Sequence, residues 1–186
     1  MATPAFFGGR LLLAMPGIGD PRFDRAVIAI CAHDDNGALG IGIGHVLHGI
    51  RFHDVLRQFD IAPGAAPDVA VHSGGPVEPQ RGFLLHSLDW GGQESLQVSD
   101  RWALSATLDI LRAIAQGKGP TRWIAALGYA GWGAGQLEEE MCGNGWFATP
   151  GDDFLLYECD VASRWAAAFK SAGIDTRLLT ADSGTA

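Results

Sequence analysis

The chain has 186 residues, of which 47% are hydrophobic, and this predicts a single domain over residues 1–186 with a hydrophobic core of its own. Its 13 basic and 21 acidic residues give a formal net charge of −8, which argues against a surface that binds nucleic-acid phosphates. Charged residues make up only 18% of the chain and 26 residues are glycine, so the composition excludes a disordered chain and a coiled coil.

The clearest local signal lies in residues 26–44, where two apolar runs rich in β-forming residues flank Asn36 and Gly37. Both residues of an Asn-Gly pair accept the positive φ of a type I′ turn, so this segment predicts an antiparallel β-hairpin. With Asn36 and Gly37 as a two-residue loop, Cys31 faces Gly42 across the two strands.

In that register the two faces of the hairpin differ in bulk. One face carries four isoleucines, Ile28, Ile30, Ile41 and Ile43. The other face carries small residues and three alternate glycines, Gly40, Gly42 and Gly44. Because glycine weakens a strand, the pattern indicates either a sharp bend of the sheet or a group that lies close to the backbone, such as a packed helix or a ligand.

The remaining pattern alternates between short strands and helices. A helical pattern at residues 54–59 is followed by β-type runs at 69–72, 82–86 and 95–98. Further along, the spacing predicts a helix at 106–116, a buried strand at 123–127, a helix at 135–142 and a strand at 154–157. Asp160 is placed to cap a final helix, and Gly173 to end it. Such alternation predicts a mixed sheet with helices.

Three cysteines, Cys31, Cys142 and Cys159, are an odd number at wide spacing, which fits neither a disulfide framework nor a zinc site. Reduced thiols are typical of the cytoplasm. The apolar run at residues 11–15 is too short for the core of a secretion signal, and no later stretch approaches the ~18 apolar residues of a membrane helix. We therefore expect a cytoplasmic protein with no membrane partner, no metal and no cofactor.

Cys31 and His33 are weak candidates for catalysis, because side chains two residues apart on a strand project from one face. A cysteine nucleophile needs a neighbouring base or helix N-terminus to lower its pKa. The simpler interpretation is a buried small cysteine beside a histidine at the end of a strand. The histidines at positions 45, 48 and 53 lack the acidic partners of a metal site.

The most unusual loop is at residues 72–77, with the sequence His-Ser-Gly-Gly-Pro-Val. Successive glycines can direct backbone N–H groups into an anion-binding concavity. The loop thus predicts a site for a small-molecule or anionic partner formed by Gly74, Gly75, Pro76, Arg81 and His86. The alternative is a turn in which glycine and proline reverse the chain, with Arg81 solvated.

For two further motifs we favour a structural interpretation over a catalytic or ligand-binding one. The glycines of residues 40–44 alternate within a strand, whereas a nucleotide-binding loop joins a strand to a helix. The consecutive glutamates at 138–140 are interpreted as a solvated helix face, because adjacent helix positions point apart.

Several of these segments also form an ordered set of motifs. Near the N-terminus they are Leu12–Pro16, Asp20-Pro21 with Phe23, Cys31-Ala32-His33 and Asn36–Gly40. The central motif combines Gly74–Val77 with Arg81–His86, and the C-terminal motif combines Leu127–Trp132, Gly135–Glu140, Asn144 and Trp146. This set resembles the bacterial YqgE/AlgH family over about residues 10–170. It departs from the family at Gly44-His45-Val46, where members usually carry Asn, a basic residue and Pro.

The resemblance implies an α+β fold with a large, mixed and strongly curved β-sheet, a pseudo-barrel flanked by helices. It implies little chemistry, because no catalytic residue or DNA-binding element is established for the family. Members are treated as transcriptional regulators because one of them was linked to the control of exopolysaccharide genes.

Two hypotheses about function remain open at this point. The first is a regulatory or binding module that acts through a protein or small-molecule partner and does not bind DNA directly. The alternative is a small enzyme or redox sensor that uses Cys31, with His33 or His86 as its base. The lack of a catalytic constellation and the acidic charge favour the first.

Overall fold

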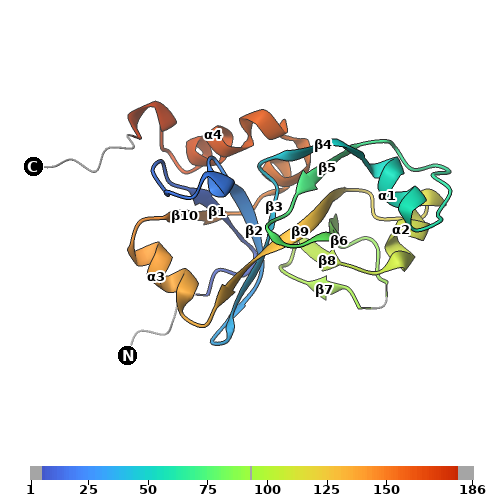
Figure 1. Ribbon diagram of the computed structural model, residues 1–186, viewed down its shortest axis with the longest axis horizontal. Coiled ribbons are helices and arrows are strands. Elements are labelled where there is room, and N and C mark those ends of the chain that lie inside the picture. The colour runs from blue at the N-terminus through green and yellow to red at the C-terminus, as the bar shows by residue number, and fades with distance from the viewer. Residues whose placement is uncertain (1–5, 93, 180–186) are drawn as a thin grey trace, which may run out of the picture.

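The computed structural model describes residues 6–92 and 94–179, and ten strands within them form one strongly curved sheet (Figure 1). Eight strands follow one another in the order β10-β1-β2-β3-β9-β6-β8-β7, while β5 pairs with β9 and β4 pairs with β5. The β5–β9 pair is parallel and the other pairs are antiparallel. The expected α+β fold with a curved, mixed sheet is confirmed. The strands are β1 (Arg10–Ala14), β2 (Val27–Asp34), β3 (Gly37–Gly42), β4 (Val46–Arg51), β5 (Ala70–Ser73), β6 (Val77–Ser87), β7 (Leu96–Gln97), β8 (Trp102–Ser105), β9 (Trp123–Gly133) and β10 (Trp146–Pro150).

Helices cover the sheet where the apolar spacing predicts them: α1 (Phe52–Gln58), α2 (Leu108–Ala115), α3 (Gln136–Cys142) and α4 (Val161–Ser171). Short 3-10 turns lie at Pro21–Phe23 (η1) and Thr176–Leu178 (η3). No helix among the described residues has the length and hydropathy needed to cross a bilayer.

One predicted element is wrong. The apolar run at 154–157 is not a strand but part of a π-helical turn, η2 (Phe154–Glu158), in which the Cys159 N–H donates to the Phe154 carbonyl over 2.8 Å. The turn buries Leu155 and Leu156 while Phe154 stays 54% exposed. A short apolar run is compatible with such a turn and with a strand, so its sequence alone does not distinguish them. Four strands, β1, β4, β8 and β10, were not predicted as separate elements.

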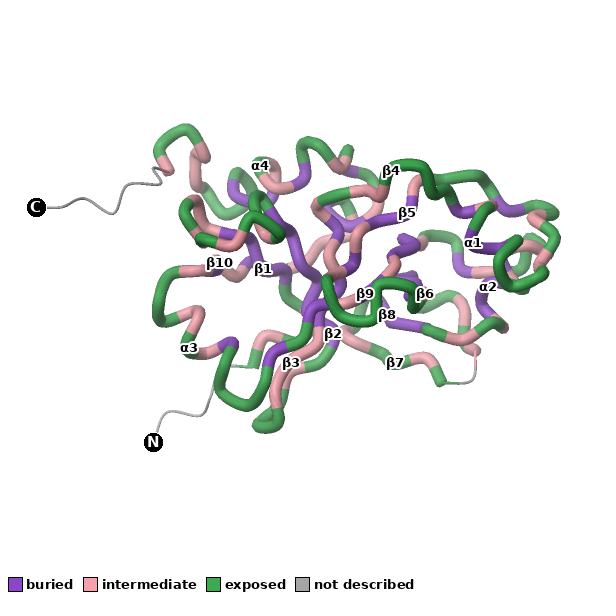
Figure 2. Tube along the Cα trace, in the orientation of Figure 1, coloured by how far each residue is buried: buried purple, intermediate pink, exposed green. Residues whose placement is uncertain are grey.

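Both faces of the sheet are buried. Along β1, Leu11 and Leu13 enter one core cluster with Phe169 of α4, while Leu12 and Ala14 enter another on the opposite face. A third cluster lies between α1, α2 and the strands β5, β6 and β9. Buried residues therefore concentrate on β1 and β2, whereas β4 is largely exposed (Figure 2).

The hairpin of β2 and β3 is confirmed, but its predicted register is wrong. Asp34 pairs with Gly37, so the two-residue loop is Asp35-Asn36 and not Asn36-Gly37. A bulge at Cys31 shifts the register again, and Ile30 pairs with Gly40. As a result the four isoleucines do not share a face: Ile28 and Ile30 pack in one core cluster, and Ile41 and Ile43 pack in another.

The small residues of β3 accommodate a close approach of backbone to backbone. The Gly42 N–H donates to the Gly74 carbonyl over 2.7 Å, and the Gly74 N–H donates to the Leu127 carbonyl of β9 over 2.8 Å. A Cβ on Gly42 would lie 2.4 Å from the Ser73 oxygen, and one on Gly74 would lie 2.1 Å from the Gly128 oxygen. The group near Gly42 is thus the loop after β5, whereas Gly40 lies against Ile28 of β2 and Gly44 against the backbone at Val27.

A buried arginine fastens α4 to the sheet. Arg164 is only 4% exposed, and its Nη1 donates to the Ile43 carbonyl after β3 and to Nε2 of His72 on β5, over 3.2 Å in the second case. Its Nε and Nη2 donate to the carbonyls of Leu155, Leu156 and Cys159. All five guanidinium hydrogens are therefore directed at acceptors, and none is left for a ligand.

Candidate functional site

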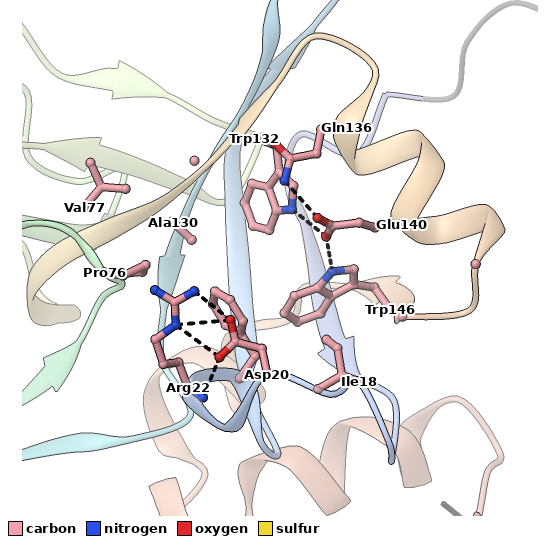
Figure 3. Close-up of a pocket in the computed structure, with 14 residues that line it drawn as sticks. Ile18, Asp20, Arg22, Pro76, Val77, Ala130, Trp132, Gln136, Glu140 and Trp146 are labelled. Atoms are coloured by element: carbon pink, nitrogen blue, oxygen red, sulfur yellow. Dashed lines mark hydrogen bonds and ion pairs between the residues drawn. The ribbon is translucent and has the colours of Figure 1, made fainter. Parts of the chain in front are cut away.

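A cavity of about 470 Å³ lies where three distant parts of the chain meet. The η1 turn forms one wall, the segment from β9 through α3 forms the opposite wall, and the start of β6 and of β10 complete the lining (Figure 3). We call this space the indole cavity, and its central side chains are Asp20, Arg22, Phe23, Trp132, Glu140 and Trp146. Its volume is in the range of sites that hold small molecules.

Glu140 organises the α3 wall of the indole cavity. Its Oε2 accepts the indole N–H groups of Trp132 and Trp146 over 2.9 and 2.8 Å, and its Oε1 accepts Nε2 of Gln136 over 2.9 Å. The two indole rings cross at 79° with centroids 6.1 Å apart. Each tryptophan is more than 90% buried, so the carboxylate fixes the edges of two rings that also pack in the core.

The opposite wall carries an ion pair within the η1 turn. Asp20 precedes Pro21, and its carboxylate accepts the Arg22 backbone N–H over 3.0 Å and the Arg22 Nη2 over 2.7 Å. These hydrogen bonds from Arg22 lower the pKa of Asp20. The ring of Phe23 then meets the ring of Trp146 edge to face, with centroids 5.5 Å apart.

A second cavity of about 280 Å³, here called the glycine cavity, adjoins the first, because Arg22, Phe23 and Pro76 line both. Its floor consists of the β2 residues Val27 and Ile28 and of the backbone of four glycines, Gly42, Gly44, Gly74 and Gly75. His45 also lines it and directs Nε2 at the Asp24 carbonyl over 2.8 Å. The departure from the family motif at residues 44–46 thus lies at the border of this cavity.

Of the five residues predicted to form a binding site, three lie together at these cavities: Gly74, Gly75 and Pro76. The predicted anion-binding nest lacks one of its donors, because the Gly74 N–H already donates to a β9 carbonyl. Arg81 lies apart, on a stretch of β6 where the pairing with β9 is interrupted between Val77 and Gly82. Its guanidinium meets Glu78 over 3.3 Å and stays about half exposed.

His86 is separated from that loop by the length of β6. It pairs with Trp123, whereas Val77 pairs with Tyr129 six residues along β9, which corresponds to about 20 Å of extended strand. The imidazole is fully buried, and its Nε2 meets the hydroxyl of Ser105 over 2.8 Å. Burial lowers the pKa of His86, so the ring is neutral near pH 7.

The side chains of the catalytic candidates Cys31 and His33 are both buried, and each has other partners. Cys31 is 4% exposed in the core, and burial raises the pKa of its thiol, which disfavours a thiolate. His33 accepts the Phe7 N–H at Nδ1 over 3.0 Å, so its Nε2 donates to Glu138, also over 3.0 Å. Both ring nitrogens are therefore occupied, and neither is directed at the thiol.

The glutamates at 138–140 are not a uniformly solvated face, so that interpretation needs correction. Glu139 is exposed, but Glu138 binds His33 and Glu140 binds two indoles. The reason is tertiary: α3 packs across the ends of β3, β9 and β10, which brings donors to two of its three consecutive acids. The sequence signal that pointed this way was the pair of tryptophans on either side of α3.

Comparisons with known proteins agree on one family. A model of the AlgH-like family matches residues 11–177. The chain is 61% identical over 186 residues to a UPF0301 protein of Rhizorhabdus wittichii, with 100% of both chains covered. It is 50% identical over 182 residues to a UPF0301 protein of Rhodospirillum rubrum, covering 97% of this chain and 95% of the relative.

Solved structures give the same result. The solution structure of the AlgH protein from Pseudomonas aeruginosa superposes with a TM-score of 0.80 at 35% identity, covering 100% of this chain and 99% of that one. A crystal structure of protein DIP2367 from Corynebacterium diphtheriae shares the fold, with a TM-score of 0.74 at 19% identity over 92% of this chain and 90% of that one. The chain therefore belongs to the AlgH-like family, the YqgE/AlgH family that its motifs resemble.

Proposed function

We propose that the protein is a binding module that holds a small-molecule or peptide partner in the indole and glycine cavities. The observation that supports this most directly is the convergence of motifs that are distant in the sequence. Segments at residues 20–23, 74–77, 127–132 and 135–146 carry the family resemblance, and all four contribute lining residues to the indole cavity. A hydrophobic core alone does not require these segments to enclose a space.

The groups around the cavity are arranged to hold a partner and not to react with one. The carboxylate of Asp20 is paired with Arg22, and that of Glu140 accepts three N–H groups. A general acid or base needs a carboxyl or imidazole free to exchange a proton with the substrate. Among the described residues, the lining of the indole cavity contains no cysteine, serine or lysine that a nucleophilic mechanism would use.

Any effect on transcription would then pass through the bound partner and not through direct contact with DNA. The formal charge of −8 repels phosphates at long range, and in the structure Arg22, Arg51, Arg57, Arg81, Arg122 and Arg177 each pair with an acidic side chain. The three cysteines are free, in keeping with a cytoplasmic protein.

The proposal is tested by adding a small-molecule extract of bacterial cells to the ¹⁵N-labelled protein and following the indole N–H signals by NMR. We expect the signals of Trp132 and Trp146 to shift, while that of Trp123, which lines a different cavity, stays in place.

Two matched substitutions complete the test. Val77 borders the indole cavity, and Val69 borders the separate cavity that Trp123 lines. Each of the two valines is 36% exposed. Val77→Trp should narrow the indole cavity and abolish the shifts, whereas Val69→Trp should not. Unchanged indole signals in the wild-type protein, or shifts that persist in Val77→Trp, would contradict the proposal. Tight, salt-sensitive binding of the purified protein to duplex DNA would contradict its second part.

A further inference from the structure

Building on the proposed function, we infer that the indole cavity selects a cationic group, such as the guanidinium or ammonium end of an arginine-like or lysine-like ligand. The inference concerns the sign of the charge that the cavity accepts. It depends on how each charged side chain of the lining is compensated.

Three charged side chains of the described part of the chain line the cavity, and two of them compensate each other. Arg22 and Asp20 form an ion pair with several hydrogen bonds, the shortest of 2.7 Å. Glu140 is the third, and among the described residues it takes part in no salt bridge. Its three hydrogen-bond donors, two indoles and one amide, are all neutral. The cavity therefore carries one negative charge that no described residue compensates by an ion pair.

The carboxylate has room for a further donor. Oε2 accepts two N–H groups, while Oε1 accepts only the amide of Gln136. A carboxylate offers about four acceptor positions, so Oε1 can accept one more N–H from a ligand. A charged donor is favoured there, because hydrogen bonds between ions are about twice as strong as those between neutral groups.

Aromatic rings supply the second attraction for a cation. Trp132, Trp146 and Phe23 all line the cavity, and adjacent rings meet edge to face at 79° and 72°. The three rings thus border one space, and the negative face of an indole attracts guanidinium and ammonium groups. The apolar side chains Ile18, Val77 and Ala130 provide contact for the methylene groups that carry such a cation.

An anionic ligand is disfavoured by the charges around the cavity. The guanidinium of Arg22 already faces Asp20, and the N–H of Gly74 is bound to β9. An anion would also meet the uncompensated Glu140 and the formal charge of −8 of the whole chain. The charge balance thus favours a cation over the anion that the glycine loop predicted.

Three probes with the same backbone test the inference: N-acetyl-arginine amide, N-acetyl-glutamine amide and N-acetyl-glutamate amide. Each is titrated into the full chain at low salt, with the Trp132 and Trp146 indole N–H signals as the readout. We expect the arginine probe to bind about tenfold more tightly than the glutamine probe, and the glutamate probe not to bind. The preference should decrease as the salt concentration rises.

A matched pair of variants on α3 isolates the charge. Glu140→Gln removes the charge but keeps an oxygen for the indole N–H groups, whereas Glu139→Gln makes the same change on an exposed neighbour. We expect Glu140→Gln to lose the preference for arginine and Glu139→Gln to keep it. The comparison of the three probes on the wild-type protein decides the question even where Glu140→Gln does not fold.

The inference and the proposed function can fail separately. Equal or tighter binding of the neutral or acidic probe, or an unchanged arginine preference in a folded Glu140→Gln protein, would overturn the cation while leaving a binding cavity. Absence of any response to all three probes would likewise overturn the inference. The NMR experiments with the cell extract and the Val77→Trp variant then test the proposed function independently.

Discussion

The most direct test of the core concerns the pH dependence that His72 gives to stability. Its Nδ1 lies 3.2 Å from the Ala125 carbonyl, so this nitrogen carries the proton, and its Nε2 accepts from Arg164 over 3.2 Å. A proton on Nε2 would face the guanidinium in a buried place. Burial and the charge of Arg164 together lower the pKa of His72 from 6.5 to about 4.

The magnitude follows from linkage. The unfolded chain takes up a proton near pH 6.5, but the folded chain does so only near pH 4, so the unfolded state binds more protons between these values. Above pH 6.5 the His72 ring is neutral in both states, and the free energy of unfolding has its full value. This free energy falls as the pH drops from 6.5 towards 4. At about 1.36 kcal/mol per pKa unit, His72 costs the fold about 3 kcal/mol over this range.

The assay is urea unfolding of the wild-type protein and of His72→Asn at several values between pH 7 and pH 4. Asparagine cannot titrate, and its amide can still donate to the Ala125 carbonyl. The wild-type free energy of unfolding should fall by about 3 kcal/mol more than that of the variant. His86 and the carboxylates are present in both proteins, so their contributions cancel. Parallel pH profiles would refute the buried Arg164–His72 contact as described.

Four further substitutions or reactions test other contacts. Arg164→Met leaves buried carbonyls without donors and should lower the free energy of unfolding by about 3–5 kcal/mol in urea titrations. Iodoacetamide should modify the exposed Cys142 and spare the buried Cys31, as mass spectrometry of peptides would show. Gly75→Ala should cost at least about 2 kcal/mol or prevent folding, because its φ is +150° and a Cβ would lie 2.1 Å from Tyr129. Arg81→Ala should stay within about 0.5 kcal/mol of wild type by thermal unfolding, because its ion pair is exposed.

The β2–β3 hairpin shows how much of the structure the local sequence pattern can predict. Turn-forming residues between two apolar runs locate the reversal, but Asp34, Asp35, Asn36 and Gly37 can all occupy turn positions. The structure selects among them through the Asp34 carboxylate, which accepts the Asn36 N–H over 2.8 Å. The bulge at Cys31 depends on packing in the core, so neither the register nor the division of the isoleucines could be read from spacing.

The candidate site was partly visible in the sequence. The sequence predicted the Gly74–Pro76 loop as part of the site, because glycine frees the backbone and proline restricts it, and both effects are local. The sequence did not predict that Glu140 accepts two indole N–H groups, because the donors lie on β9 and β10 and the helical spacing of α3 contains no information about them. Conversely, Arg81 and His86 follow the loop closely in sequence, but an interrupted strand carries them elsewhere.

The position of β1 in the sheet has a consequence for how the chain is made. Residues 10–14 pair on one side with β2, which follows soon after, and on the other side with residues 146–150. During synthesis, the first strand is therefore complete long before its second neighbour exists. Contacts this distant in sequence are slow to form, and an apolar strand with an open edge invites pairing with other chains. Truncation before residue 146 should thus yield aggregating chains that depend on chaperones, although most of the sheet has already been synthesised.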